Sequence, residues 1–354
     1  MNMTSLLDAC QNPANALLAA SLSLVIGLST DVAADEDVLH WRMNSLLYPK
    51  LFGEAGEHFA EGVRRRTNGS FIIEVHDRLV LDQDSFGALN SGLIDAVWGS
   101  AGHHHREDAA LAIFSGFPFG PDPEGFTAWM RDGGGTEVLD RIYAKHDLKG
   151  HYCGALPIEG GGWFRAPVEH LKNLNGLRMR SFGYGARTLM KLGVITYELP
   201  ATDIRPAMAT GLIDAAEFSL PSIDADLGLS EVARHLYQPG WQQPATALEI
   251  LMPLKSWLAL SAGHKAAIKS ACDETLSWTL AAVPKQQERT ILQFRKEGVE
   301  LHDWPEEVLA ALRKAWEEVI TEETKHNPML AEAWNSYRLF QDRHGAPPLQ
   351  GYAE

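Results

Sequence analysis

Short apolar runs alternate with longer amphipathic stretches in the first third of the chain. Apolar runs of four to eight residues predict strands, and apolar residues spaced three and four apart predict helices. On this basis the sequence predicts two βα units and a third strand, at residues 38–44, 51–66, 71–75, 84–91 and 93–98. Strands that alternate with helices indicate right-handed βαβ units and mainly parallel sheets.

The same order of elements returns downstream in shorter pieces. They are expected at residues 176–181, 185–192, 194–197, 203–210 and 212–218. Each series contains one copy of a nine-residue segment, Ala-Leu-Asn-Ser-Gly-Leu-Ile-Asp-Ala or Ala-Met-Ala-Thr-Gly-Leu-Ile-Asp-Ala, and six of the nine residues are identical. In both copies a helix ends at a glycine, Gly92 or Gly211, which suits the left-handed backbone of a helix end. The repeat predicts an α/β fold of two similar lobes with a ligand cleft between them; a single larger α/β domain is the alternative.

The C-terminal third is mostly helical in pattern. A strand-like run at 248–254 can return the chain to the first lobe, and a helix is expected over 261–297 with a kink or break at Pro284. Further helices are expected at 305–325 and 328–342. Two crossings and one long helix spanning both lobes would form a hinge.

The last helix carries a single apolar face, made of Leu330, Trp334, Tyr337 and Phe340. This face either packs on a lobe or is shared with a second subunit, as a homodimer through the C-terminal helix. The elements give lobe I as 35–160 plus about 248–290, lobe II as 161–247 plus about 291–342, and a tail at 343–354.

The N-terminus resembles a signal peptide. Residues 16–28 form an apolar stretch too short to span a bilayer, and Val32-Ala33-Ala34 resembles a cleavage site. These features predict a signal peptide over 1–34 and a periplasmic protein. No Lys or Arg precedes Arg42, unlike in a usual signal peptide, so a different start codon or a disordered leader is the alternative.

Charge and cysteine content exclude several classes of function. The chain has 46 Asp and Glu against 31 Lys and Arg, so nucleic acid and anionic lipid are poor partners. Three cysteines exclude a disulfide scaffold. Cys153 and Cys272 could pair in an oxidising compartment, but two buried free thiols are the interpretation that the sequence favours. The chain shows no nucleophile motif, phosphate loop or dinucleotide fingerprint.

Chemistry is expected where the repeated strands end. If the two series correspond, Arg180 matches Asn44, and Glu217-Phe218 matches Trp98-Gly99. Arginine can hold a carboxylate through two parallel hydrogen bonds, although a surface arginine paired with a nearby acid is the alternative. A glutamate at the end of a buried strand, Glu217, must be paired, hydrogen-bonded or bound to a cation.

Glu159 can supply a second oxygen donor. It precedes three glycines and Trp163, in a loop whose backbone can approach a ligand closely.

Five linked motifs then carry a resemblance to a known family. They are Cys153-Gly154, Glu159-Gly-Gly-Gly-Trp-Phe-Arg165, Gly176-Leu-Arg-Met-Arg180, Ile213-Asp-Ala-Ala-Glu-Phe218 and Tyr237-Gln-Pro-Gly-Trp241. In this order they resemble the periplasmic solute-binding component of tripartite ATP-independent periplasmic (TRAP) transporters, over residues 38–340. The resemblance is strongest to the branch that binds 2-oxo acids and related carboxylates.

The resemblance implies a two-lobed binding protein, not an enzyme, that delivers a small carboxylate to the TRAP membrane subunits. In this family an arginine holds the carboxylate, and it matches Arg180. The resemblance also implies a bound cation held by Glu217, the backbone carbonyl of Phe218 and the side chain at position 159, here Glu159. The predicted substrate contacts are therefore Arg180, Glu159, Phe218, His103, Trp98 and Asn44.

The chain departs from this branch at four places near the site. It has Glu159 where Gln is usual, Phe218 where Trp is usual, and Arg205 where Tyr is usual. A histidine run, His103-His104-His105, stands in place of an aromatic stretch. On an extended segment three successive histidines point to alternating sides, so we expect one imidazole, His103, to face the ligand rather than a metal cluster.

The exchange of Gln for Glu159 adds a second carboxylate to the site. We expect Ca²⁺ to be preferred over Na⁺, because additional negative oxygen donors suit the divalent ion. Arg205 offers a competing explanation, because it could pair with Glu159 and cancel its charge. Two other functions remain open from the sequence: a carboxylate sensor, and an enzyme that uses Glu159 and Glu217 as acid and base.

Overall fold

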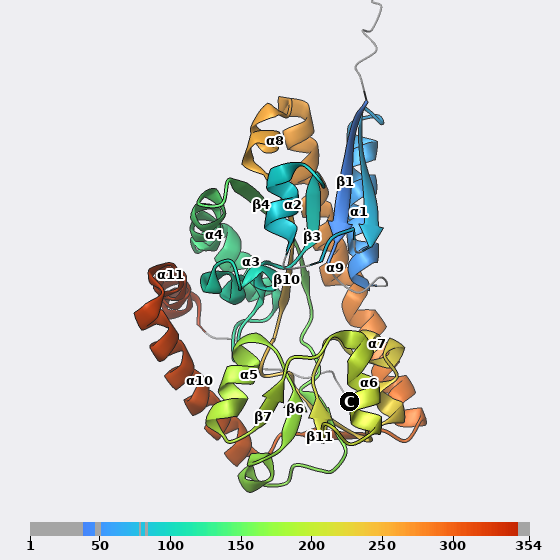
Figure 1. Cartoon of the computed structure of the whole chain (residues 1–354), viewed down its shortest axis with the longest axis vertical. Coiled ribbons are helices and arrows are strands. Elements are labelled where there is room, and N and C mark those ends of the chain that lie inside the picture. Colours follow the sequence, from blue (N-terminus) through green and yellow to red (C-terminus); the bar gives the residue numbers. More distant parts are fainter. Residues whose placement is uncertain (1–37, 47–50, 78, 82–83, 346–354) are drawn as a thin grey trace, which may run out of the picture. The chain divides into compact units, whose positions relative to one another are not determined.

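A computed structural model describes residues 38–46, 51–77, 79–81 and 84–345 (Figure 1). The predicted signal peptide, Cys10 and the last nine residues lie outside these ranges. None of the described helices combines the length and apolar character needed to cross a membrane.

The first sheet has five strands in the order β2-β1-β3-β10-β4. They are β1 (Leu39–Ser45), β2 (Phe71–Asp77), β3 (Ala96–Gly99), β4 (Leu148–Leu156) and β10 (Thr246–Pro253). The strands β2, β1 and β3 are parallel, whereas β10 runs antiparallel to both of its neighbours.

The second sheet has six strands in the order β11-β9-β5-β8-β6-β7. They are β5 (Gly162–Phe164), β6 (Arg178–Arg180), β7 (Ile195–Tyr197), β8 (Ala215–Ala216), β9 (His235–Gln238) and β11 (Glu300–Asp303). The trio β7-β6-β8 repeats the parallel trio β2-β1-β3 of the first sheet, and an antiparallel strand again follows it. The expected duplication is therefore present, but the sheets are mixed rather than mainly parallel.

Helices connect the strands of each trio and cover the sheets. Those between the trio strands are α1 (Leu51–Arg66), α2 (Ser85–Ser91), α5 (Gly183–Lys191) and α6 (Ala201–Ala209). The others are α3 (Pro123–Asp132), α4 (Gly135–Ala144), α7 (Pro221–Asp226), α8 (Leu254–Ala259), α9 (Ala262–Lys296), α10 (Glu306–His326) and α11 (Pro328–His344). Short 3₁₀ turns are η2 (Ala101–His104), η3 (Ala109–Ser115), η4 (Leu171–Leu174) and η5 (Leu229–Glu231).

The nine-residue repeat forms the same corner twice. Gly92 and Gly211 both adopt left-handed backbone, with φ of 77° and 73°. After each glycine an aspartate carboxylate accepts the backbone N–H of the arginine in the first strand of its trio: Asp95 from Arg42 at 2.8 Å, and Asp214 from Arg178 at 3.2 Å. The repeated Gly-Leu-Ile-Asp and the two Arg-Met pairs therefore join a helix end to the centre of a sheet.

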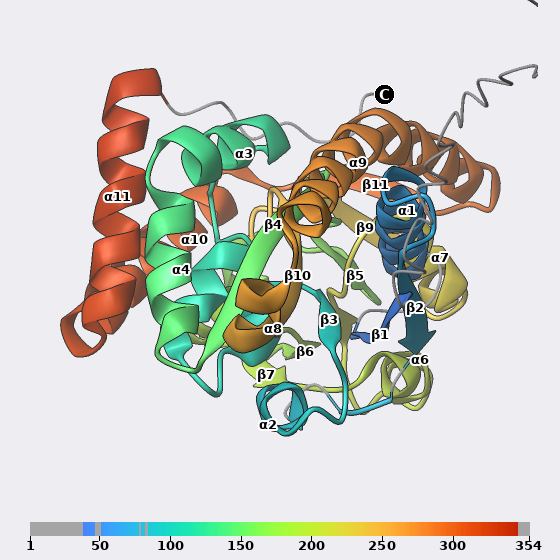
Figure 2. The same cartoon turned by 90° about the horizontal axis from the view of Figure 1, so that it is seen from above.

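Two chain segments cross between the sheets. One passes from β4 into β5, and the other from β9 into β10. The helix α9 lies beside α1 (Figure 2). It contributes Ile268 and Ala271 to the core that contains residues of α1, and Ile291 and Phe294 to the core that contains Trp163 of β5. The expected long helix that serves both lobes is thus present, and it continues through Pro284 without a break.

The two cysteines of the described chain form a disulfide. Cys153 on β4 and Cys272 on α9 have Cα atoms 4.0 Å apart. The interpretation as two free thiols was therefore wrong: both side chains are buried, as expected, but they face each other across the packing of α9 on β4.

The apolar face of α11 packs inside the chain. Leu330, Tyr337 and Phe340 are buried in the core of the first sheet, and Trp334 packs against that core. Trp316 in the middle of α10 joins the same core. We therefore propose that the chain from about residue 316 belongs with lobe I, while the start of α10 packs on lobe II.

Candidate ligand-binding site

A cavity of about 580 Å³ is lined by residues that belong to both sheets and their connections. Among its lining residues are five of the predicted site residues: His103, Glu159, Arg180, Glu217 and Phe218. Two crossing segments bring these elements together, because Glu159 lies between β4 and β5, and its partners Gln243 and Thr246 lie between β9 and the start of β10.

Arg180 is the buried cation of this cavity. It ends β6, and its guanidinium donates from Nη1 to the backbone carbonyl of Glu217 at 2.5 Å and to Glu217 Oε1 at 3.3 Å. Its Nε donates to the Leu199 carbonyl at 3.3 Å, and the Phe218 ring lies 4.8 Å from the guanidinium carbon. These contacts fix the guanidinium plane at the wall of the cavity.

Glu217 is held in place on two sides. Its backbone N–H donates to the Arg180 carbonyl, which continues the β6–β8 pairing. Its Oε1 atom accepts the backbone N–H of Phe182 at 3.0 Å as well as the Arg180 hydrogen bond. With only 6% of the side chain exposed, Glu217 is a buried carboxylate paired with a buried cation.

Glu159 approaches the same cavity from the first crossing segment. Its Oε1 atom accepts hydrogen bonds from Thr246 Oγ1 at 2.9 Å and Gln243 Nε2 at 3.1 Å. Burial, and then the neighbouring carboxylate of Glu217, raise the pKa of Glu159 well above its ordinary value. Glu159 therefore gives up its proton less readily than an ordinary carboxyl group.

The three glycines after Glu159 have a different role from the expected one. Gly161 donates to the Tyr237 carbonyl at 2.8 Å, and a Cβ there would lie 2.6 Å from Trp304 Nε1. None of the three glycines appears among the residues that line the cavity. They allow the two crossing segments to pack closely, and only Glu159 of this run reaches the cavity.

The histidine run forms a 3₁₀ turn instead of the expected extended segment. His103 lines the cavity, and its Nδ1 lies 3.1 Å from the Ser100 carbonyl. His104 is buried against Phe86, and burial lowers its pKa to about 3. His105 packs edge-on against Phe182. The three imidazoles therefore diverge.

Asn44 and Trp98 do not appear among the residues that line the cavity. The strand register does make Asn44 the counterpart of Arg180, but its Oδ1 accepts the backbone N–H of Leu79 at 2.6 Å. Trp98 is fully buried, stacks on Phe59 and donates its indole N–H to the Phe52 carbonyl at 3.0 Å. Both side chains hold neighbouring segments in place.

Arg205 does not pair with Glu159. It forms an ion pair with Glu231, and its side chain is 51% exposed. The competing explanation for the charge of Glu159 is therefore wrong.

Sequence reasoning missed several polar residues of the cavity. Gln242 donates to the Gly160 carbonyl at 2.7 Å, and its Oε1 is buried without a hydrogen-bond partner in the part of the chain that the structure describes. The same holds for Ser219 Oγ. The signal for Gln242 lay in its position, directly after the Tyr-Gln-Pro-Gly-Trp motif.

A protein-family match covers almost all of the segments that form this cavity. Residues 49–326 match the bacterial extracellular solute-binding protein family 7, DctP, which is more than half of the chain. The chain belongs to this family. It is an extracytoplasmic solute-binding protein of a TRAP transporter and not an enzyme, so the acid–base alternative for Glu159 and Glu217 is excluded.

Named relatives of this solute-binding protein bind small carboxylates. It is 27% identical over 333 residues to the monocarboxylate 2-oxoacid-binding periplasmic protein of Nostoc sp.. The aligned region covers 92% of this chain and 91% of the relative. A TRAP transporter solute-binding protein from Bordetella bronchiseptica is 29% identical, with a TM-score of 0.82 over 87% of this chain and 93% of that chain. Its crystal contains a dimer with calcium and picolinate in one of the two sites.

A third relative shows the same fold with another cation. The TRAP periplasmic solute-binding protein from Pseudoalteromonas atlantica is 24% identical, with a TM-score of 0.80 over 86% of this chain and 94% of that chain. That structure contains sodium and pyruvate. The two-sheet architecture with long helices is therefore that of TRAP solute-binding proteins.

Proposed function

We propose that this protein binds a 2-oxo acid, or another carboxylate with a donor atom on its α carbon, together with a metal cation. The observation that carries the proposal is the buried Arg180 guanidinium, fixed beside Glu217 in a cavity lined from both sheets. In this assignment Arg180 holds the ligand carboxylate, and the cation lies between the ligand, the Glu159 and Glu217 carboxylates and the Phe218 carbonyl.

Charge balance supports the cation. Among the described residues, two protein carboxylates and the ligand carboxylate would share the cavity with one buried arginine, Arg180. An uncompensated buried charge is strongly unfavourable. With Glu159 deprotonated, the three carboxylates and Arg180 have a net charge of −2. Ca²⁺ would bring this charge to zero, whereas Na⁺ would leave one negative charge. Ca²⁺ also accepts more oxygen ligands in flexible geometry, which supports it as the preferred ion.

Ligand chemistry supports the requirement for an α donor. A 2-oxo acid can chelate a cation through its keto oxygen and one carboxylate oxygen. Picolinate, found with calcium in the Bordetella protein, presents a ring nitrogen in the same relation to its carboxylate. A cation bridge would therefore recognise the carboxylate and its α donor, while His103 and the buried Ser219 and Gln242 contact the remaining polar atoms.

Titration calorimetry tests this assignment directly. Pyruvate and propionate differ in the keto oxygen, and each is titrated in Ca²⁺, in Na⁺ and after chelator treatment. We expect pyruvate to bind most tightly with Ca²⁺ and at least about tenfold more weakly after chelation, and propionate to bind weakly in all three conditions. Equal binding of the two acids would exclude a cation chelated by the ligand.

Arg180 variants test the anchor. Arg180→Ala removes the guanidinium but also leaves Glu217 unpaired, so Arg180→Lys is included to retain the charge without the bidentate geometry. We expect both variants to lose pyruvate binding by at least about tenfold, because neither Ala nor Lys can keep the contacts to Glu217 and the Leu199 carbonyl and also donate to the ligand carboxylate. Arg178→Ala is the matched control, because Arg178 lies on the same strand and pairs with Asp214 away from the cavity. Unchanged affinity in Arg180→Lys and Arg180→Ala would remove Arg180 as the anchor.

We propose that the loaded protein delivers its ligand to TRAP membrane subunits. Uptake of labelled pyruvate into vesicles that contain those subunits, with and without this protein, measures delivery and separates it from a sensor role. The homodimer predicted through the C-terminal helix would use the outer face of α11, where Leu339 is 58% exposed, because the inner face is buried.

A further inference from the structure

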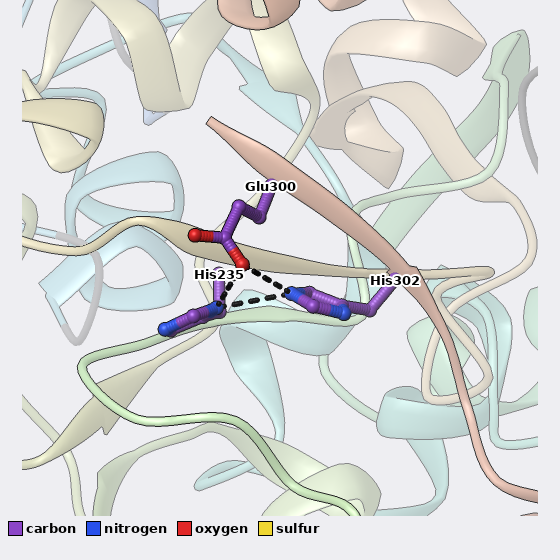
Figure 3. A group of neighbouring side chains, drawn as sticks. All are labelled: His235, Glu300 and His302. Atoms are coloured by element: carbon purple, nitrogen blue, oxygen red, sulfur yellow. Dashed lines mark hydrogen bonds and ion pairs between the residues drawn. The ribbon is translucent and has the colours of Figure 1, made fainter. Parts of the chain in front are cut away.

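Three metal-ligating side chains converge at the edge of the second sheet, outside the carboxylate cavity. They are His235 on β9 and Glu300 and His302 on β11 (Figure 3). Figure 3 shows the two imidazoles turned toward each other with the Glu300 carboxylate above them. None of the three is among the residues that line the carboxylate cavity, so this site is independent of the function proposed above.

The strand pairing explains why the three side chains meet. Glu300 is the register partner of His235 in the parallel pair β9–β11, and His302 lies two residues further along β11. Residues two apart on a strand point to the same face of a sheet. Glu300 and His302 therefore share one face, next to His235.

The distances between the donor atoms suit a tetrahedral ion. His235 Nδ1 lies 3.0 Å from His302 Nε2 and 3.4 Å from Glu300 Oε2, and His302 Nε2 lies 3.7 Å from the same Oε2. A tetrahedral Zn²⁺ with bonds near 2.0–2.1 Å has ligand atoms about 3.3–3.4 Å apart. The three donor atoms therefore occupy one face of a tetrahedron of nearly the right size.

The surrounding residues hold this arrangement in place. The Tyr237 ring stacks on His302 with centroids 4.9 Å apart and an interplanar angle of 18°. The Tyr237 hydroxyl is itself fixed by the backbone N–H of Val168 at 2.7 Å. Arg234, the neighbour of His235 in sequence, donates its guanidinium to the Glu297 carbonyl and not to the Glu300 carboxylate. A ligand ring with restricted orientation lowers the entropic cost of binding a metal.

We propose that His235, Glu300 and His302 form a binding site for a divalent transition-metal ion of the zinc type, with water as the fourth ligand. Two imidazoles and one carboxylate are a frequent ligand set for Zn²⁺, and they differ from the all-oxygen set expected for Ca²⁺. In the metal-free protein one imidazole donates to the other across the 3.0 Å contact. Metal binding requires only that the donating imidazole move this proton to its other ring nitrogen.

A metal at this position would join two parts of the hinge. The strand β9 leads into the second crossing segment, and β11 follows α9, which contributes to the cores of both sheets. Since β11 is an edge strand, a metal bond to β9 would restrain its local separation from the sheet.

Equilibrium dialysis against Zn²⁺ tests the site, with Ca²⁺ present to occupy the cavity carboxylates. We expect wild-type protein to retain one Zn²⁺ per chain, and both His302→Ala and Glu300→Gln to weaken retention by at least about tenfold. Glu300 is exposed, so its substitution tests the site without a change in the core. Circular dichroism and pyruvate binding report whether each variant is folded.

His76→Ala is the matched control. His76 lies on β2, where its Nε2 atom is 3.5 Å from Glu74 Oε2, and His40 Nδ1 lies 3.8 Å from the other oxygen of Glu74. In the described part of the chain, however, these donor atoms do not meet at one point as those of His235, Glu300 and His302 do. This variant should retain Zn²⁺ like the wild type. Absence of stoichiometric Zn²⁺ in the wild type, equal retention in His302→Ala, or loss in His76→Ala would each overturn the proposal.

Discussion

Glu159 gives the cavity a charge that depends on what it binds. Within the described chain, the donors to its carboxyl group are the neutral side chains of Gln243 and Thr246, while the buried Arg180 is hydrogen-bonded to Glu217. The raised pKa of Glu159 therefore means that a proton and a cation compete for one carboxyl group.

We expect Glu159→Gln to weaken Ca²⁺ binding by at least about tenfold, because the variant removes one anionic oxygen ligand. In the wild type the folded pKa of Glu159 is raised, so protonation blocks the site at low pH and Ca²⁺ affinity increases as the pH rises. The variant should lose most of this increase. Equilibrium dialysis with metal analysis from pH 5 to pH 9 measures both effects.

Glu231→Gln is a suitable control for this measurement, because Glu231 is exposed and paired with Arg205. Equal Ca²⁺ retention and equal pH dependence in wild type and Glu159→Gln would show that Glu159 is not a cation ligand.

The sequence predicted which residues lie at the strand ends better than which side chains face the cavity. His103, Glu159 and Arg180 all line it. Asn44 and Trp98 do not, because strand equivalence fixes the position of a Cα atom and not the direction that packing gives to its side chain. The large Trp98 ring packs in the core beside Phe59, and its indole N–H donates to the Phe52 carbonyl there.

At the scale of elements, the joints between the two sheets were the least predictable feature. The glycines after Glu159 and the antiparallel strands β5 and β10 are explained by contacts between crossing segments far apart in sequence. Local periodicity contains no information on such partners. For the same reason the pairing of Cys153 with Cys272, across 119 residues, could not be derived from spacing.

The disulfide fastens the helix α9 to the crossing strand β4. We expect the double variant Cys153→Ala, Cys272→Ala to lose roughly 2–4 kcal/mol of unfolding free energy, because closing a loop of more than 100 residues restricts the unfolded chain. Pyruvate affinity should be nearly unchanged, since neither cysteine lines the cavity. Urea unfolding with and without reductant measures the loss.

Reductant provides the internal control for this experiment. It should destabilise the wild type by about as much as the double substitution does and leave the variant unchanged. Identical unfolding midpoints for oxidised and reduced wild type would contradict a stabilising disulfide.

At the scale of the whole molecule, the repeated strand trio explains the two-sheet fold, and the residues that differ between the two copies form the site. The two parallel trios share strand order and the corner built on Gly92 and Gly211. This is why a repeat of nine residues was enough to predict two lobes. The mixed sheets and the return of α11 to the first core depend on contacts that the repeat does not encode.

Stability of the whole chain should also depend on a buried acid away from the cavity. Glu249 on β10 is 5% exposed and accepts a hydrogen bond from the Tyr143 hydroxyl. Burial, only partly offset by this hydrogen bond, raises the pKa of Glu249 to about 8. A carboxyl group with a raised folded pKa favours the folded state while it is protonated, and this contribution decreases as the pH rises toward 8.

We therefore expect the wild type to lose stability on the order of a few kcal/mol between about pH 5 and pH 8. Glu249→Gln keeps an acceptor for Tyr143 but cannot ionise, so its unfolding free energy should decrease less over this range. Asp224, whose pKa burial also raises to about 8, and Glu159, whose pKa is raised as well, leave a residual decrease in the variant. Urea unfolding in the presence of chelator, at half-unit pH steps, measures the difference. Glu57 is exposed, so Glu57→Gln is the control and should lose stability with pH as the wild type does. If the Glu249→Gln curve ran parallel to the wild-type curve, Glu249 would be ionised in the folded protein from pH 5 to pH 8.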